Sequence, residues 1–263
     1  TLNMKLSIVL GTYNRAHLLK RSLETYARQP FRDFEIIIID DSSIDDTFEV
    51  VRSYMGRIDI KYIFIDKGDF RWRDSSSFIN LGIRAAKGEA VIPTHPEVMM
   101  GEMTLQTISD NMLHWHYVCA KPYYLTIDDQ KHIDEADWQS NVLNITKRKG
   151  FYEQQSAEHS GNEQYTHANM EKHSKWESWV FGGMTKATWR RIGGLSESEA
   201  WGPVDISFAN RRKILGIENT TVQGVETMVV HQNHDDGTPR DMKKAIENTK
   251  TITYYTEAIE HHV

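Results

Sequence analysis

Phe34-Glu-Ile-Ile-Ile-Ile-Asp40-Asp41-Ser42-Ser43 is an uninterrupted apolar run that ends abruptly in acids and hydroxyls. Four successive isoleucines predict a buried strand of the kind found in parallel sheets. The polar residues that follow predict a turn at the carboxyl end of that strand. Because ligands of parallel α/β sheets bind beyond the carboxyl ends of the strands, Asp40 and Asp41 are candidate site residues.

The flanking segments alternate between strand and helix patterns. Upstream, Lys5-Leu-Ser-Ile-Val-Leu-Gly-Thr12-Tyr13-Asn14-Arg15 predicts a second strand with a polar turn, and an amphipathic helix follows over 16–29. Downstream, the patterns predict a helix over 48–55, a strand over 60–65 and a helix over 75–86. This alternation predicts an α/β fold with a doubly wound, mostly parallel sheet flanked by helices.

The next strand lies in Gly88-Glu-Ala-Val-Ile-Pro-Thr-His95-Pro96-Glu97 and ends in two potential metal ligands. Residues two apart on an extended backbone point the same way, so His95 and Glu97 are predicted to converge. An imidazole with a carboxylate suits manganese or zinc better than an all-oxygen cage would. Taken alone, the stretch could equally be a surface turn around Pro96. The two earlier strands also end in polar turns, however, so all three turns are expected to line one crevice.

Four motifs, taken together and in this order, resemble the family 2 glycosyltransferases of the GT-A fold. They are Ile8-Val-Leu-Gly-Thr-Tyr-Asn-Arg, Ile37-Ile-Ile-Asp-Asp-Ser-Ser, Asn80-Leu-Gly-Ile-Arg-Ala-Ala-Lys-Gly-Glu and Gly193-Gly-Leu-Ser-Glu. The similarity is close over about 4–110 and looser over about 178–235. The chain departs from the family where His95-Pro96-Glu97 replaces the usual Asp-x-Asp.

The resemblance implies one GT-A domain over 1–263. Within it, 1–118 is expected to bind the nucleotide, 119–238 to bind the acceptor, and 239–263 to form a C-terminal helix. The polar stretch 121–175 is either an insertion that folds over the acceptor half or an ordinary surface excursion.

The predicted donor site lies at the first strand ends. Tyr13 offers an aromatic face to a base, and Asp41 can accept hydrogen bonds from a uracil imide or a ribose hydroxyl. Basic side chains could neutralise a diphosphate, although Arg71 and Arg73 could also belong to a solvated loop. Asn80 would back the pocket or serve the fold. The full predicted set is Thr12, Tyr13, Arg15, Asp41, Lys67, Arg71, Arg73 and Asn80.

The candidate general base is Asp205. Trp201-Gly-Pro-Val204-Asp205-Ile-Ser-Phe208 looks like the family's Trp-Gly-x-Glu-Asp-x-Asp-Phe, with Val204 where Glu is usual. A carboxylate there could take the proton from an attacking hydroxyl, and it could also cap a helix over 206–215. Weaker candidates for the base are Glu197 and Glu199. The resemblance further implies acceptor-binding roles for Trp179, Gly183 and Trp201.

Two late histidines follow a short apolar strand predicted over 227–230. His231 and His234 are three residues apart, and some members of the resembling fold use a late histidine as a metal ligand. His231 is preferred because it lies nearest the strand end. The predicted metal site is therefore His95, Glu97 and His231, with Mn²⁺ as the ion.

Composition excludes several classes of protein. A net charge of −6 gives no basic field for nucleic acid, and no apolar run approaches the ~18 residues of a membrane span. The single Cys119 excludes an internal disulfide and predicts a reducing, cytoplasmic location.

The sequence therefore predicts a metal-assisted, inverting transfer of a sugar from a nucleotide diphosphate donor, preferably a UDP-sugar, to a glycan or other hydroxyl acceptor. One alternative is a nucleotidyltransferase, although the first turn lacks the Gly-rich basic loop of that class. Another is a degenerate module that only binds nucleotide or glycan, which the His-Pro-Glu stretch and Val204 keep open.

Overall fold

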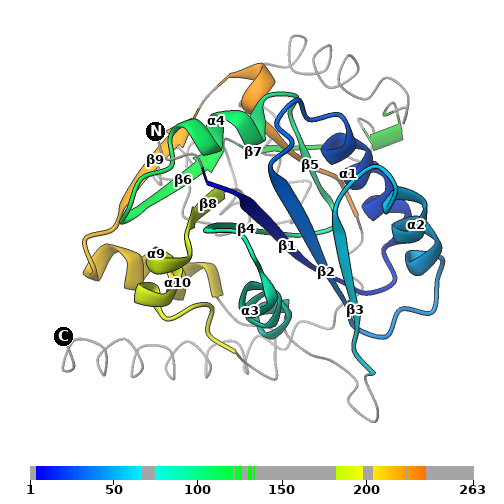
Figure 1. Ribbon diagram of the computed structural model, residues 1–263, viewed down its shortest axis with the longest axis horizontal. Helices are drawn as coiled ribbons and strands as arrows, with labels where there is room; N and C mark the ends of the chain where they lie inside the picture. The colour runs from blue at the N-terminus through cyan, green and yellow to red at the C-terminus, as the bar shows by residue number, and fades with distance from the viewer. Residues whose placement is uncertain are drawn as a thin grey trace.

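The computed structural model describes residues 4–66, 75–120, 122–125, 130–131, 133, 182–197, 204–222 and 224–234. Within them, one large mixed sheet and one small sheet carry helices on their faces (Figure 1). No helix in these ranges is both long enough and apolar enough to cross a lipid bilayer.

The large sheet has seven strands and confirms the predicted α/β class. In spatial order they are β3 (Ile60–Phe64), β2 (Phe34–Asp40), β1 (Leu6–Thr12), β4 (Ala90–Thr94), β8 (Gly182–Thr185), β6 (His116–Ala120) and β9 (Glu218–Val222). The first four run parallel, β8 is antiparallel to both of its neighbours, and β9 is parallel to β6. The carboxyl ends of β1 to β4 therefore meet at one edge.

The core explains why the isoleucine run forms the sheet. All seven residues of β2 are buried, and Ile36 to Ile39 are fully inaccessible. Each such side chain contributes about 1.5–3 kcal/mol of burial free energy. The register pairs Thr12 with Asp40, so the first two strands end level with each other.

Four described helices follow the predicted patterns with small shifts at their ends: α1 (Ala16–Ala27), α2 (Thr47–Tyr54), α3 (Ser75–Ala85) and α10 (Val204–Ile214). The helices α4 (Thr104–Asp110) and α9 (Lys186–Ile192) and the 3₁₀ turn η3 (Val225–Thr227) were not predicted. Figure 1 shows α1 and α2 near the β3 side of the molecule and α9 and α10 on the other side. The glycine at position 82 lets α3 lie close to the sheet, because a Cβ there would be 2.3 Å from Val9 Cγ1.

A buried carboxylate that the sequence analysis did not identify fastens the other end of these strands. Glu35 accepts hydrogen bonds from Ser7 Oγ (2.7 Å) and from the backbone N–H of Lys87 (2.6 Å) and Gly88 (3.3 Å). Burial raises the pKa of Glu35, but these donors outweigh it and hold the pKa below its ordinary value. Glu35 thereby ties β1, β2 and the turn before β4 together.

The small sheet was not predicted as such. It consists of β5 (Val98–Met100), β10 (Val229–His231) and β7 (Pro122–Tyr124), with β10 in the centre. The strand predicted over 227–230 is thus displaced toward His231. The helix predicted within 121–175 and the one over 239–263 lie outside the described residues, so both stay predictions, as does the division into halves.

Candidate functional site

The turns after β1 and β2 are hydrogen-bonded to each other. Asn14, with a left-handed φ of 50°, accepts from the Ile44 N–H at 2.8 Å and donates its own N–H to Ser43 Oγ at 2.9 Å. Asp45 reaches back from the second turn and accepts from the Ala16 N–H, at the start of α1, at 2.9 Å. The two turns therefore form one unit at the carboxyl edge of the sheet.

The acids after β2 have different surroundings. Asp40 supports the turn, because its Oδ1 accepts from the Ser43 N–H at 2.8 Å while its Oδ2 accepts from the Tyr62 hydroxyl of β3 at 2.6 Å. Asp41 and Thr12 are almost buried, with 3% and 4% of their surface exposed, and the Asp41 N–H donates to the Thr12 carbonyl at 2.9 Å. Tyr13 beside them is 46% exposed. The predicted donor residues of these two turns therefore lie together.

The pairing of β10 with β5 brings the late histidines to Glu97. His231 is the antiparallel partner of Val98, and the next residue, Gln232, donates its N–H to the Glu97 carbonyl at 3.0 Å. As a result Glu97 Oε1 lies 3.7 Å from His231 Nε2 and 3.5 Å from His234 Nε2. Glu97, His231 and His234 each offer one ligand atom, and these atoms lie within 4.8 Å of one another.

These separations fit ligands of a single ion. Two atoms bonded to one tetrahedral ion at about 2.1 Å lie about 3.4 Å apart, which is close to both distances from Glu97. The 3.7 Å separation from His231 also exceeds the usual 2.7–3.2 Å of a hydrogen bond. One carboxylate and two imidazoles form the mixed donor set of manganese and zinc sites rather than magnesium sites.

His95 does not join this group. The chain is not extended between His95 and Glu97, because β4 ends at Thr94 and the Val98 N–H donates to the His95 carbonyl across a turn. The premise that the two side chains share a strand face was therefore wrong. They still meet, with His95 Nδ1 3.2 Å from Glu97 Oε1, at hydrogen-bonding distance. A ligand role for His95 stays a prediction.

The electrostatics of the cluster centre on Glu97. Burial raises the pKa of this carboxyl, but the neighbouring His234 and His95 imidazoles and the charge of Arg15 hold the pKa well below its ordinary value. Arg15 Nη1 lies 3.5 Å from the other carboxylate oxygen, Oε2. Glu97 is therefore ionised at neutral pH, which is the state that a metal ligand requires.

Gln232, a residue that sequence reasoning missed, holds the cluster to α1. Its side chain is fully buried and donates to the carbonyls of Leu18 (3.0 Å) and Glu97 (3.3 Å). It accepts from Arg21 Nη1 at 3.3 Å. A glutamine between two histidines gave no periodic signal by which the sequence could have identified it.

The acceptor side is described in part. Asn80 on α3 donates to the Leu195 carbonyl (2.8 Å) and to Glu197 Oε1 (2.9 Å), so it fastens the segment after α9. Asp205 is the second residue of α10, and its side chain lies outside the described part. Gly183 is buried in β8, where a Cβ would be 2.8 Å from Ile92 Cγ1. Close packing against Ile92 is therefore a sufficient reason for a glycine at this position. The roles proposed for these residues stay predictions.

Several predicted site residues fall outside the described residues altogether. They are Lys67, Arg71, Arg73, Trp179, Glu199 and Trp201.

A family model matches more than half of this chain, and individual known proteins match shorter parts of it. Residues 7–162 match the family model "Glycosyl transferase family 2". Validoxylamine A glucosyltransferase of Streptomyces hygroscopicus subsp. jinggangensis is 42% identical over 105 residues, which are 39% of this chain and 24% of that protein. Chondroitin synthase of Escherichia coli is 33% identical over 114 residues, 41% of this chain and 16% of that protein. The chain thus matches about a quarter or less of these relatives.

Solved structures agree on the architecture. Staphylococcus aureus TarS 1–349 in complex with UDP-GlcNAc superposes with a TM-score of 0.67 at 14% identity, over 95% of this chain and 65% of that one. The mannosyltransferase PcManGT of Pyrobaculum calidifontis, in complex with GDP-Man and Mn²⁺, gives 0.57 at 16% identity, over 90% of this chain and 59% of that one. At such identities the likeness concerns the fold alone.

Proposed function

The chain belongs to glycosyl transferase family 2 and has the GT-A fold, and on that premise we propose that it transfers a sugar from a nucleoside diphosphate donor to a hydroxyl acceptor. Relatives whose names describe glucosyl transfer and chondroitin synthesis support this reaction type. Structural neighbours that hold UDP-GlcNAc and GDP-Man support a nucleotide-sugar donor. UDP-sugars remain the preferred donors.

The observation that carries the proposal is the cluster of Glu97, His231 and His234 at the carboxyl edge of the large sheet. In this proposal the three side chains hold one divalent ion, Mn²⁺ first, and His95 orients Glu97 through the 3.2 Å contact. A bound ion would offset the charge that builds on the departing diphosphate. The complex of PcManGT with Mn²⁺ supports this assignment.

The donor contacts come from the joined turns. Asp41 receives hydrogen bonds from the base or ribose, with Thr12 beside it and Tyr13 as the stacking face. Arg15 turns from Glu97 to the diphosphate oxygens, together with Lys67, Arg71 and Arg73. Among the proposed donor residues, Asn80 acts indirectly, because it positions the 195–197 segment by hydrogen bonds.

Asp205 acts as the general base in this proposal. Its carboxylate takes the proton from the acceptor hydroxyl as that oxygen attacks the anomeric carbon. The family resemblance implies a single displacement at that carbon, and a single displacement inverts its configuration. The start of α10 favours an ionised carboxylate at this position, because a helix N-terminus stabilises negative charge. Trp179, Gly183 and Trp201 remain the candidates for acceptor binding.

One experiment tests the reaction type and the cluster together. Release of free nucleotide from radiolabelled UDP- and GDP-sugars is followed with Mn²⁺, with Mg²⁺ and with chelator. The wild type is compared with Glu97→Gln and with Asp110→Asn, a control that removes an exposed carboxylate on α4. We expect turnover with Mn²⁺ in the wild type and in Asp110→Asn. We expect this turnover to disappear in chelator and in Glu97→Gln. Full turnover in chelator would contradict the metal assignment, and absence of turnover with every sugar would contradict the function.

A further inference from the structure

A cavity lies against α3 in the described part of the protein. It has a volume of about 620 Å³ and lies between α3, α9 and the segment 193–197. Its wall begins at Lys186, which follows Thr185, the partner of Ala90 at the amino end of β4. Thr94, at the carboxyl end of that strand, lies about 13 Å farther along at 3.3 Å per residue, and Glu97 follows it. The part of the cavity around Lys186 therefore lies toward the amino edge of these strands.

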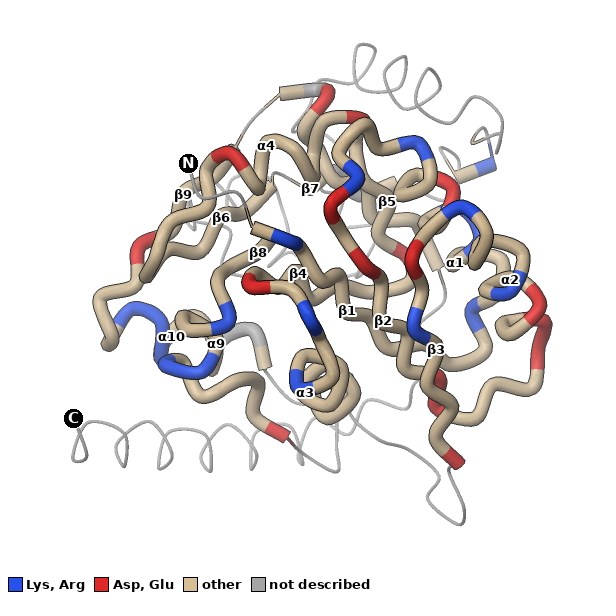
Figure 2. Tube along the Cα trace, in the orientation of Figure 1, with Lys and Arg blue, Asp and Glu red and all other residues tan. Residues whose placement is uncertain are grey.

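The charge of this cavity is opposite to that of the protein. The chain carries −6 overall, yet among the residues that the structure describes, four basic side chains and one acidic side chain line the cavity. They are Arg84, Lys186, Arg190, Arg211 and Glu197. Figure 2 shows how Lys and Arg positions gather on α3, α9 and α10 around this part of the molecule.

Two of these cations keep their charge available to a ligand. Arg84 and Arg190 are exposed, and neither forms an ion pair with any residue in the described ranges. Lys186 donates only to a carbonyl, that of Ala86, at 2.7 Å. The acid of the cavity, Glu197, already accepts from Asn80. The described lining of the cavity thus has an excess of positive charge.

The uncharged lining mixes the polar side chains of Asn80 and Ser196 with apolar ones, one of which is an aromatic ring. Trp189 is 5% exposed and shares the wall with Ile83 and Leu195. Volumes of about 300–1,000 Å³ hold small organic ligands, and guanidinium groups bind phosphate through paired hydrogen bonds. An apolar wall below a rim of cations suits a molecule with an organic body and a phosphate at one end.

We propose that this cavity, lined by Arg84, Lys186, Arg190 and Trp189, is a second ligand site that binds a small organic phosphate of about mononucleotide size. The phosphate lies between the Arg84 and Arg190 guanidinium groups and the Lys186 ammonium group. The organic part rests on Trp189, Ile83 and Leu195. None of these six residues belongs to the proposed donor or metal set, although the cavity also borders Asn80 and Glu197, which were considered above as a donor residue and as an alternative base. The proposal does not depend on the transferase activity.

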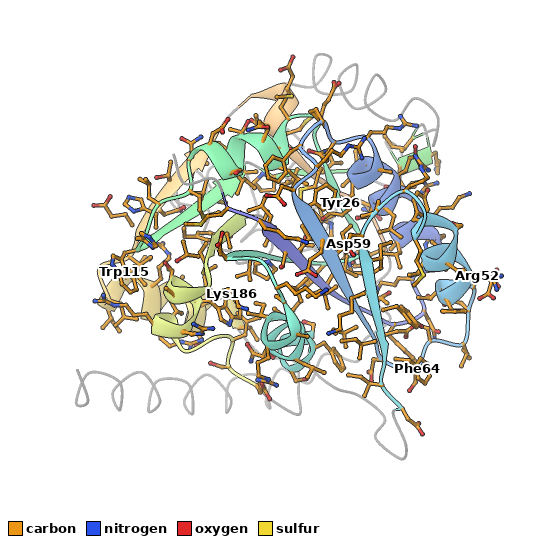
Figure 3. All side chains as sticks on the ribbon, viewed as in Figure 1. Tyr26, Arg52, Asp59, Phe64, Trp115 and Lys186 are labelled. Atoms are coloured by element: carbon orange, nitrogen blue, oxygen red, sulfur yellow. The ribbon has the colours of Figure 1, made fainter. Side chains whose placement is uncertain are left out.

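Calorimetry with defined probes tests the proposal. Uridine 5′-monophosphate and glucose 1-phosphate are titrated at low salt in chelator, each beside its uncharged parent, uridine or glucose, and beside inorganic phosphate. The Arg84→Gln/Arg190→Gln protein is compared with Arg52→Gln, an exposed arginine on α2 that Figure 3 labels far from Lys186. Circular dichroism and thermal unfolding check that each variant folds.

The expected result is saturable binding of at least one phosphomonoester to the wild type and to Arg52→Gln. In the double variant the affinity falls by about tenfold or more, because two charge-assisted contacts are lost, and in the wild type it falls as salt screens the rim. Equal affinity in the double variant, no binding of either phosphomonoester, or inorganic phosphate binding as tightly as both would each overturn the proposal. Turnover of nucleotide sugars is measured in the same proteins. Retained turnover with lost phosphomonoester binding separates this site from the transfer site.

Discussion

Arg15 Nη1 lies 3.5 Å from Glu97 Oε2, whereas the three histidine contacts of Glu97 are all to Oε1. The carboxylate therefore divides its two oxygens between a guanidinium and a set of imidazoles. The positively charged Arg15 side chain therefore already lies beside Glu97, the carboxylate that is proposed to bind the metal ion.

The first prediction concerns this competition. Arg15→Gln should raise the affinity for Mn²⁺ in the absence of nucleotide by about tenfold or more, because a unit charge a few ångströms away is removed. The same change should weaken binding of a nucleoside diphosphate, which loses a cationic partner. Calorimetric titrations of the wild type, Arg15→Gln and the Arg52→Gln control measure both effects. Weaker Mn²⁺ binding in Arg15→Gln would show that Arg15 supports the ion rather than competing with it.

A second prediction ranks the histidines. Alanine at His231 or His234 should weaken Mn²⁺ binding more than alanine at His95, because the first two are placed as ligands and the third as a partner of Glu97. Loss of a supporting partner typically costs 10–100-fold in affinity, so the ligand variants should lose more than about 100-fold. If His95→Ala weakens Mn²⁺ binding the most of the three variants, the ligands are His95, Glu97 and His231, as the sequence alone predicted.

The third prediction isolates the base. Asp205→Asn should leave nucleotide binding nearly intact and lower kcat by about 10²–10⁴-fold, the usual contribution of general base catalysis. Single-turnover and steady-state measurements on the variant, with Asp110→Asn as a control, separate binding from chemistry. A near-normal kcat at saturating acceptor would mean that Asp205 is not the general base, and Glu197 or Glu199 would be the next candidate.

A fourth prediction concerns the dependence of stability on pH. Hydrogen bonds from Arg57, opposed by partial burial and reinforced by Arg28 and Tyr54, lower the pKa of Glu24 from 4.5 to about 2. Because the folded-state pKa lies below the ordinary value, ionised Glu24 stabilises the fold above about pH 4.5. This stabilisation is lost as the pH falls toward 2. Glu24→Gln should therefore lower the free energy of unfolding at pH 7 by about 1–2 kcal/mol.

Urea unfolding of wild type and Glu24→Gln at several pH values below 7 measures this difference. The gap between the two proteins should narrow steadily below pH 4.5. A gap that stays constant down to pH 3 would mean that Glu24 stabilises the fold by packing alone.

The fifth prediction compares two glycines. Gly82→Ala would place a methyl group 2.3 Å from Val9 Cγ1, so α3 must shift, and overpacking of this kind costs about 1–3 kcal/mol. At Gly56 an added Cβ meets nothing within 4 Å, so Gly56→Ala should be neutral or slightly stabilising. Thermal unfolding of the two variants gives the comparison directly. Equal stability of both would mean that α3 can move from the sheet at no cost.

The regular part of the fold could be predicted because its signals are local. The run from Ile36 to Ile39 and the amphipathic spacing after Arg15 each fix an element within a few residues. The small sheet could not be predicted in this way. Its strands have three residues each, too few for a hydrophobic period, and they come from three separate parts of the chain.

The same limit applies to the candidate site. Glu97 was identified because it follows a strand, but its partners depend on the register of β10 against β5, which no local pattern encodes. The pairing of His95 with Glu97 rested on an extended backbone through Pro96, where the chain instead turns. His231 was preferred to His234 only because it lies nearest the strand end. Side-chain ties such as those of Glu35, Asp45 and Gln232 depend on tertiary neighbours in the same way.

The place of β10 has a consequence for the order in which the protein matures. This strand comes late in the chain, but it is the centre of the small sheet and carries or adjoins two of the three proposed ligands. The Gln232 side chain and the Glu97 carbonyl that it contacts are 135 residues apart. A nascent chain that has emerged only as far as α4 holds Glu97 without the late histidines. Long-range pairing of this kind forms slowly, so uptake of an ion would report that the growing chain has folded through its final described strand.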